Sequence, residues 1–217
     1  YILSKIKNET NILSKIKNKT NILSKIKNKT NITEKLKISK YTLFPKDKDE
    51  LMEIIGNEIK QYGYECDLNH INVSEIEDMS TLFMGTYFNG DISGWDVSNV
   101  TDMTDMFKGS QFNNDISEWD VSNVKYMESM FMESKFNGDI SSWDVSNVIN
   151  MRFMFYKANF NRDISLWNVS NVKSMFYMFY GSNFNQDISK WKINPKCDTG
   201  GIFTGCKIFP NFRPKLL

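Results

Sequence analysis

Two periods of apolar and polar residues divide the chain. Residues 1–40 repeat a ten-residue unit that begins as YILSKIKNET. At about 100° per residue, the apolar stripe of this unit slips by about 80° per repeat, so a straight helix would have no single apolar face. We therefore expect residues 1–40 to form a lysine-rich extension, either a weak helix or an extended tract.

The next segment has the pattern of an amphipathic helix. Asp47 and Glu50 have the spacing of a capping box, and Gly63 is a favourable stop. Between them, one apolar stripe recurs at helical spacing. It consists of Leu51, Ile54, Ile55, Ile59 and Tyr62. This pattern predicts a helix over 47–62 that covers the start of whatever follows.

From Cys66 onward, large apolar residues recur every 24 residues. One repeat reads FNNDISEWDVSNVKYMESMF, from Phe112 to Phe131. The first copy, near Asp67–Met79, and the last copy, after Trp191, are degenerate. The conserved spacing includes four series of side chains: Phe88, Phe112, Phe136, Phe160 and Phe184; Trp95, Trp119, Trp143, Trp167 and Trp191; Met79, Met103, Met127, Met151 and Met175; Phe83, Phe107, Phe131, Phe155 and Phe179.

A single repeat buries too little apolar surface to offset the backbone entropy of 24 residues, so the repeats must stack. The Asn-x-Asp-Ile-Ser segment suits a short parallel strand. Val124, Met127, Met130 and Phe131 have the spacing of a short helix. We therefore predict an α/β repeat solenoid with short parallel strands, short helices and an N-terminal capping helix. Its parts are an extension (1–40), a capping-helix segment (41–65), the solenoid (66–209) and a tail (210–217).

The repeats FNGDISGWDVSNVTDMTDMF and FNGDISSWDVSNVINMRFMF resemble those of BspA-like leucine-rich-repeat surface proteins, a repeat also known from mycoplasma-type lipoproteins. The resemblance covers roughly residues 41–209, and residues 1–40 depart from it. It implies a leucine-rich-repeat-like solenoid on a secreted or surface-exposed, lipoprotein-like protein that functions in adhesion or partner binding. It implies no chemistry.

The charge of the chain is divided unevenly between its ends. Residues 1–40 contain 11 lysines and two glutamates, whereas the remaining residues contain 16 basic and 24 acidic groups, and the net charge is +1. A lysine-rich extension suits an acidic membrane surface, nucleic acid or no partner at all. Recognition motifs for nucleic acid are missing from the sequence and the body is acidic, so we expect no nucleic-acid partner. No stretch of the sequence has the roughly 20 apolar residues of a transmembrane helix.

Catalysis is not indicated by the sequence. His70 is the single histidine, which excludes triads and metal sites that need two or more. The repeated aspartates, such as Asp115 and Asp139, could form a calcium ladder, but backbone hydrogen bonds within their bends explain them better. The repeated asparagines, such as Asn113, suit a structural amide ladder. We expect no enzyme activity and no cofactor.

Positions that vary between repeats are the candidates for binding, because packing does not dictate them. In the last two full repeats these positions become aromatic where earlier repeats are mostly polar. A cluster of exposed aromatic side chains is a candidate partner-binding patch. The alternative is that it packs under the tail 209–217. The patch consists of Phe153, Tyr156, Phe176, Tyr177 and Tyr180.

Two functional hypotheses follow from these patterns. The first is a non-catalytic surface or secreted protein that binds a protein or glycan partner. The second is an intracellular or viral scaffold with a basic tail. Cys197 and Cys206 lie nine residues apart in the closing segment and could form a disulfide after export. Such a bridge would favour the first hypothesis.

Overall fold

The structure is a computed structural model that describes residues 40–216. The decapeptide repeats of residues 1–39 lie outside the described residues, so the prediction of a weak helix or extended tract there stays a prediction. Residues 43–216 belong to one compact unit. The fold below is that of this unit.

The capping helix predicted from the sequence is present. Helix α2 spans Lys48–Tyr62, and the side chain of Asp47 accepts a hydrogen bond from the backbone N–H of Glu50. Gly63 ends the helix with φ +87°, a conformation that favours glycine. Leu51 and Ile55 are buried, but Tyr62 is 63% exposed and does not belong to the buried stripe.

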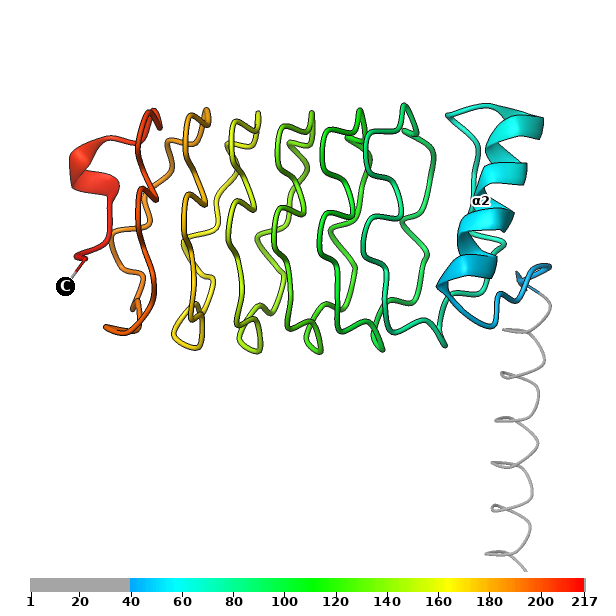
Figure 1. Cartoon of the computed structure of the whole chain (residues 1–217), viewed down its shortest axis with the longest axis horizontal. Coiled ribbons are helices and arrows are strands. Elements are labelled where there is room, and N and C mark those ends of the chain that lie inside the picture. The colour runs from blue at the N-terminus through cyan, green and yellow to red at the C-terminus, as the bar shows by residue number, and fades with distance from the viewer. Residues whose placement is uncertain (1–39, 217) are drawn as a thin grey trace, which may run out of the picture. The chain divides into compact units, whose positions relative to one another are not determined.

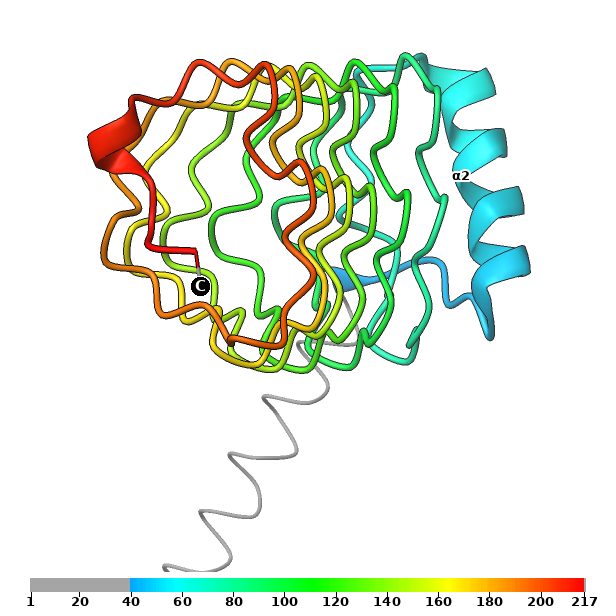
Figure 2. The ribbon, with the colours of Figure 1, turned by 60° about the vertical axis from the view of Figure 1, so that its left-hand side comes forward.

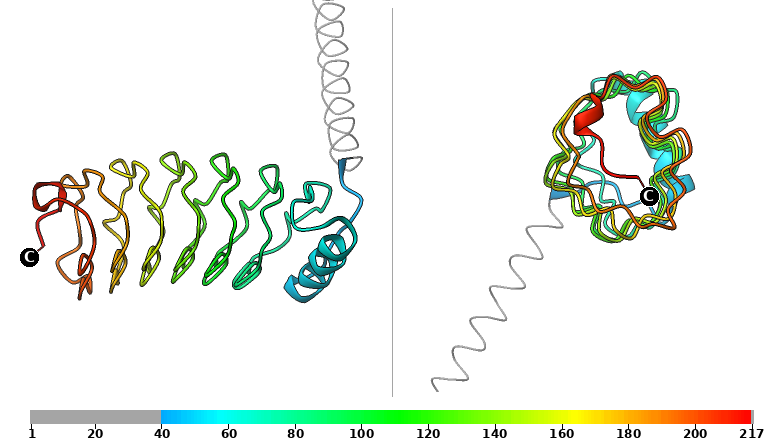
Figure 3. Two further views of the ribbon diagram at one scale, coloured as in Figure 1. Left: turned by 90° about the horizontal axis from the view of Figure 1, so that it is seen from above. Right: turned by 90° about the vertical axis from the view of Figure 1, so that its left-hand side faces the viewer.

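The 24-residue repeats lie one behind another, with α2 at the N-terminal end of the stack (Figures 1 and 2). Parallel bridges between equivalent residues of successive repeats fix the register. They run Asp78↔Asp102, Asp102↔Tyr126, Tyr126↔Asn150, Asn150↔Ser174 and Ser174↔Asp198. The same path of the chain therefore recurs in every repeat, as the end-on view shows (Figure 3).

The predicted α/β repeat solenoid is wrong. Within residues 40–216, α2 is the only long helix. The one further helical element is the short 3-10 helix η1 at Pro210–Phe212. The parallel pairs are isolated bridges and form no sheet in the described part of the chain. The segments expected to be helical, such as Val124–Phe131, consist of turns. The leucine-rich-repeat-like pattern of strands and helices is therefore absent from these repeats.

Hydrogen bonding explains why neither element forms. The N–H groups of Met127, Ser129, Phe131 and Glu133 donate to carbonyls of the next repeat instead of to the fourth residue back, as a helix requires. The intervening N–H groups close turns, as Met130 N–H does on the Met127 carbonyl at 3.3 Å. Ser129 and Glu133 have φ of +55°, outside both helix and strand.

We call this eight-residue segment of each repeat the turn ladder. Four N–H groups of one repeat bond to four carbonyls of the next at 2.7–3.0 Å across each of the five junctions. The donors all point toward the C-terminal end of the stack and the acceptors toward the N-terminal end. The turn ladders are residues 78–85, 102–109, 126–133, 150–157, 174–181 and 198–205.

Stacked aromatic rings fill the core. Eleven phenylalanines and five tryptophans are buried. Phe131, for example, lies 5.6 Å from Phe107 and 5.7 Å from Phe155, ring centroid to centroid, and is almost parallel to both. The indole N–H of Trp143 donates to the Ile116 carbonyl of the preceding repeat at 3.1 Å, so no polar group of the ring is left unpaired. The four other tryptophans make the same bond.

Asparagine side chains link successive repeats outside the turn ladders. The side-chain oxygen of Asn113 accepts a hydrogen bond from the backbone N–H of Asn137 at 2.7 Å, and that of Asn137 accepts from Asn161 at 2.9 Å. The predicted amide ladder is confirmed. Because a side chain replaces the backbone acceptor here, this segment needs no β-strand pairing.

Replacing Glu133 by glycine should raise the free energy of unfolding by up to about 1 kcal/mol. A non-glycine residue in the left-handed region costs about 1–2 kcal/mol, part of which the greater unfolded-state entropy of glycine cancels. Gly85, Gly109, Gly181 and Gly205 occupy the equivalent position with φ of +62° to +68°. Urea unfolding of Glu133→Gly tests this, and Lys135→Gly, where φ is not positive, should be destabilising instead.

Candidate functional site

The predicted aromatic patch lies on two adjacent turn ladders. Phe153 and Tyr156 belong to the ladder 150–157, and Phe176, Tyr177 and Tyr180 belong to the ladder 174–181. Phe153 and Tyr177 have φ of +55° and +54°, as the residues at this position in the earlier repeats do. The backbone thus places both rings at equivalent points on successive repeats.

The structure brings all five rings into contact. Tyr156 and Tyr180 stack with centroids 5.0 Å apart and planes within 9°. Phe153 contacts Phe176 edge to face at 5.7 Å, and Tyr177 contacts Tyr180 at 5.1 Å. Each ring is half-buried. The patch is therefore one continuous aromatic surface whose rings hold one another in place.

Two cations border the patch. The Arg152 guanidinium lies 5.7 Å from the Phe153 ring and 5.6 Å from the Phe176 ring, between them. Its buried Nε–H donates to no acceptor within the described residues, so the two ring faces are the main contacts of the guanidinium. Lys157 lies 5.2 Å from the Tyr156 ring. Aromatic rings beside arginine are the composition typical of protein-binding hot spots.

Glycines, rather than the tail, lie against one side of the patch. A Cβ on Gly200 would lie 2.9 Å from the Phe176 ring, and one on Gly201 would lie 2.0 Å from the Tyr177 ring. Within the described chain, the tail makes no ring contact or hydrogen bond to the five patch residues. The alternative that residues 209–217 cover the patch therefore receives no support. The sequence pattern did not reveal this contact, although Gly200 and Gly201 stand where the preceding repeat has Phe176 and Tyr177.

The repeated aspartates close bends. The carboxylates of Asp91 and Asp139 each accept the backbone N–H two residues on, at 2.9 Å. These hydrogen bonds, from Ser93 and Ser141, hold the pKa of each carboxyl below its ordinary value. At the second aspartate position of the repeat, Asp144 accepts the N–H of Ser146, and Asn168 accepts that of Ser170 in the same way, so that position needs an acceptor and not a charge. No cluster of metal-ligating side chains occurs among residues 40–216.

All three cysteines are free thiols in this structure. Cys206 Sγ lies 3.4 Å from Ser182 Oγ and donates to the Phe184 carbonyl at 3.3 Å, whereas Cys197 Sγ donates to the Asp198 carbonyl at 3.8 Å. The bridge between Cys197 and Cys206 is thus not formed, and oxidation after export stays a prediction. Burial raises the pKa of Cys66 and of Cys197, which makes them poor nucleophiles at neutral pH.

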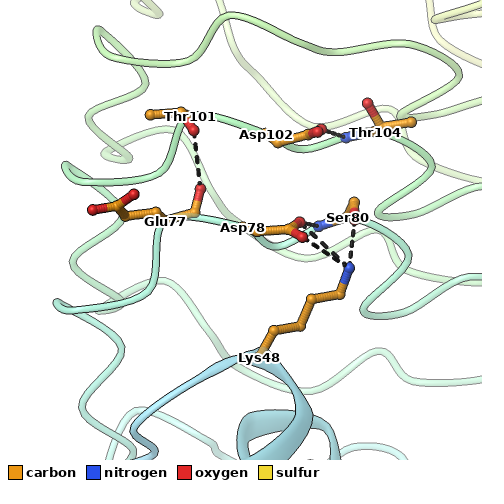
Figure 4. Close-up of polar contacts among 7 residues, drawn as sticks. All are labelled: Lys48, Glu77, Asp78, Ser80, Thr101, Asp102 and Thr104. Carbon is orange, nitrogen blue, oxygen red and sulfur yellow. Dashed lines mark hydrogen bonds and ion pairs between the residues drawn. The ribbon is translucent and has the colours of Figure 1, made fainter.

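The N-terminal end of the repeats is held by polar contacts from α2. Lys48 reaches Asp78, with Nζ to Oδ2 at 3.3 Å, and also donates to the Ser80 hydroxyl (Figure 4). His70 Nε2 lies 3.3 Å from Glu58 Oε2 of α2. The single histidine therefore faces a helix carboxylate in a contact that holds α2 against the first repeat.

A shallow hollow lies beside an exposed leucine outside the patch. Leu166 is 86% exposed, and Asp163, Gln186 and Lys190 line the hollow next to it. One exposed apolar residue among polar neighbours is normal for a protein surface. The hollow beside Leu166 therefore has a weaker binding composition than the aromatic patch.

Residues 53–158 and 132–213 match the model of a family described as "Mycoplasma protein of unknown function, DUF285". Together the two matches span most of α2 and the repeats. No curated protein matches the chain. No solved structure matches it either. Among the helices of residues 40–216, none has the length and apolar character needed to cross a membrane.

Proposed function

We proceed from the premise that this chain belongs to the DUF285 family of Mycoplasma proteins. We propose that it is a non-catalytic surface or secreted protein and that it binds a protein or glycan partner through the aromatic patch. The observation that carries the proposal is the patch itself. Its rings, from Phe153 to Tyr180, form one half-buried surface bordered by Arg152.

The ordering of the patch supports binding. Side chains that already contact one another lose little further conformational entropy when a partner arrives. The Tyr156–Tyr180 stack and the Arg152 contacts hold these side chains before any partner is present. Aromatic rings also provide flat apolar faces on which either a protein side chain or a sugar ring can pack.

The surface location rests on the resemblance of the repeats to BspA-like surface proteins, and it has its own test. Intact cells that produce the protein are treated with a membrane-impermeant biotin reagent that labels lysine. Labelling of this protein, with a cytosolic marker unlabelled, is the expected result. Labelling that occurs only after lysis would contradict a surface location and favour the intracellular scaffold.

Removing the two stacked tyrosines should weaken partner binding by about tenfold or more, because hot-spot rings contribute on the order of 1–2 kcal/mol each. The double variant Tyr156→Lys with Tyr180→Thr is suitable, since Lys108 and Thr204 occupy the equivalent positions in other repeats. The partner is first captured from the extracellular fraction or from a glycan array. Its Kd for wild type and variant is then measured by biolayer interferometry.

The matched control is Glu118→Ser, an exposed position where another repeat has Ser142. It should bind like wild type. A double variant that unfolds at the same urea concentration as wild type and binds with unchanged Kd would sink the proposal that the patch is the binding surface.

A further inference from the structure

The turn ladder has a direction that an ordinary sheet lacks. Within each turn ladder, the four N–H groups that bond to the next repeat point forward, and the four carbonyls that receive such bonds point backward. N–H groups outside this set, such as that of Gln111 on the Thr86 carbonyl, donate to the preceding repeat. Aligned peptide dipoles add along their common axis, as they do in a helix, and leave partial positive charge at the end with free N–H groups. The C-terminal end of the ladder is that end.

The last ladder has donors without acceptors. In the preceding repeat, the N–H groups of Met175, Tyr177, Phe179 and Gly181 bond to the carbonyls of residues 198, 200, 202 and 204 at 2.8–3.0 Å. No acceptor within residues 40–216 receives the equivalent four N–H groups of the last ladder. These belong to Thr199, Gly201, Phe203 and Gly205.

The tail closes a different part of this end. The Phe212 carbonyl, in η1, accepts the N–H of Ile188 at 3.0 Å, and Phe209 N–H donates to Asn185. Between the tail and the ladder remains a hollow of about 310 Å³. It is lined by Thr199, Gly201, Ile202, Phe203, Thr204, Arg213 and Leu216. The ladder edge is therefore left open beside an apolar floor.

Positive charge gathers at this edge. Residues 192–216 contain five basic residues and one acidic residue, although the body of the chain is acidic. Arg213 lies over the Phe203 ring at 5.5 Å, and its Nη2 donates to the Ile208 carbonyl at 3.1 Å. Its Nε is buried and has no hydrogen-bond partner among the described residues. An occupant of the hollow thus meets both backbone donors and a guanidinium.

We propose that the open ladder edge, Thr199 to Gly205, binds an acidic peptide segment that follows the path of a further turn ladder. Carbonyls of the peptide accept the four free N–H groups, as the next repeat does at every other junction, and a carboxylate faces Arg213. A second copy does not fit as well, because two open edges would face each other with donors only. At the other end of the stack, the outward carbonyls of the first ladder receive no backbone N–H among the described residues, and α2 lies against that end (Figures 1 and 3).

The probe is the acetylated and amidated peptide EDMSTLFMGT, which has the sequence of residues 77–86 and two carboxylates. Amide hydrogen exchange by NMR reads the edge directly. In the free protein, the four edge N–H groups should exchange at least about tenfold faster than their equivalents in the ladder 174–181. Added peptide should slow the four edge groups and leave the earlier row unchanged.

Two variants test the charge. A peptide with Glu77→Gln and Asp78→Asn, and the protein Arg213→Gln with the original peptide, should each bind about two- to fivefold more weakly. The Glu118→Ser protein, changed at an exposed position of an earlier repeat, should bind the peptide like wild type.

Three results would overturn the proposal. In the first, the four edge groups of the free protein are as slow as those of the preceding row. In the second, the peptide protects none of them. In the third, protection appears without peptide and grows with protein concentration, which would identify a second copy as the occupant.

Discussion

Phe131→Ala will lower the free energy of unfolding by about 3–5 kcal/mol, the range for removing a fully buried phenylalanine. Phe131 is completely buried in the middle of the stack. Its ring stacks on Phe136 at 4.3 Å and on Phe107 and Phe155 in the repeats on either side. Alanine therefore leaves a cavity that three neighbouring rings border.

The matched control is Phe203→Ala, the equivalent position in the last repeat. Phe203 stacks on one preceding phenylalanine, Phe179, at 5.9 Å. Because stability in a stacked repeat protein is a sum of nearest-neighbour contacts, we expect a smaller loss there, about half as large. Guanidinium unfolding followed by tryptophan fluorescence measures both. Equal losses at the two positions would contradict the nearest-neighbour picture.

The register of the repeats was predictable from the sequence, and their backbone path was not. The 24-residue spacing of Phe112 and Trp119 requires equivalent residues to stack, and they do. The spacing of Met127, Met130 and Phe131, however, fits both a helix and consecutive turns. Periodicity records which side chains are buried, and it does not record where the N–H groups donate.

One signal in the sequence could have indicated the turns. Glycine occurs at the second left-handed position of four ladders, for example at Gly85 and Gly181. The first left-handed position gives a much weaker signal, because it is glycine only at Gly201 and carries residues such as Thr81 and Phe153 in the earlier ladders. Bonds to neighbouring repeats hold these residues in an unfavourable conformation, and such long-range effects are hidden in a single repeat.

The candidate site was predictable as a set of residues. Variation at positions 153, 156, 176, 177 and 180 identified side chains that do lie together. The sequence could not place Arg152 over the Phe176 ring or Gly200 against Phe176, because these contacts join residues of different repeats. The open N–H row was likewise hidden, since it depends on the backbone direction of the turn ladder.

Gly90→Ala will destabilise the N-terminal end of the stack by about 1–3 kcal/mol, the cost of forcing an extra group into a packed site. A Cβ on Gly90 would lie 1.9 Å from the Cys66 carbonyl oxygen and 2.9 Å from its carbon. The obstacle is backbone, which cannot rotate away as a side chain does. The same carbonyl accepts the N–H of Asp91 at 3.2 Å, so that its displacement also breaks a hydrogen bond.

Gly138→Ala is the matched control, because it changes the equivalent glycine of a later repeat. There a Cβ would meet the Phe136 ring at 2.8 Å, and the nearest backbone atom, the Asn114 oxygen, lies at 3.6 Å. Asn114, Arg162 and Gln186 occupy this position in other repeats, so the path accepts a side chain. We expect a change within about 0.5 kcal/mol after the ring adjusts.

Urea unfolding followed by circular dichroism at 222 nm reports on α2, and tryptophan fluorescence reports on the repeats. Gly90→Ala should shift the dichroism midpoint more than the fluorescence midpoint, because the clash lies in the opening repeat against which α2 packs. If Gly90→Ala and Gly138→Ala shift both midpoints equally, the close approach of Gly90 to Cys66 does not constrain the fold. A selective loss at the α2 end would show that this single backbone contact fixes how the stack begins.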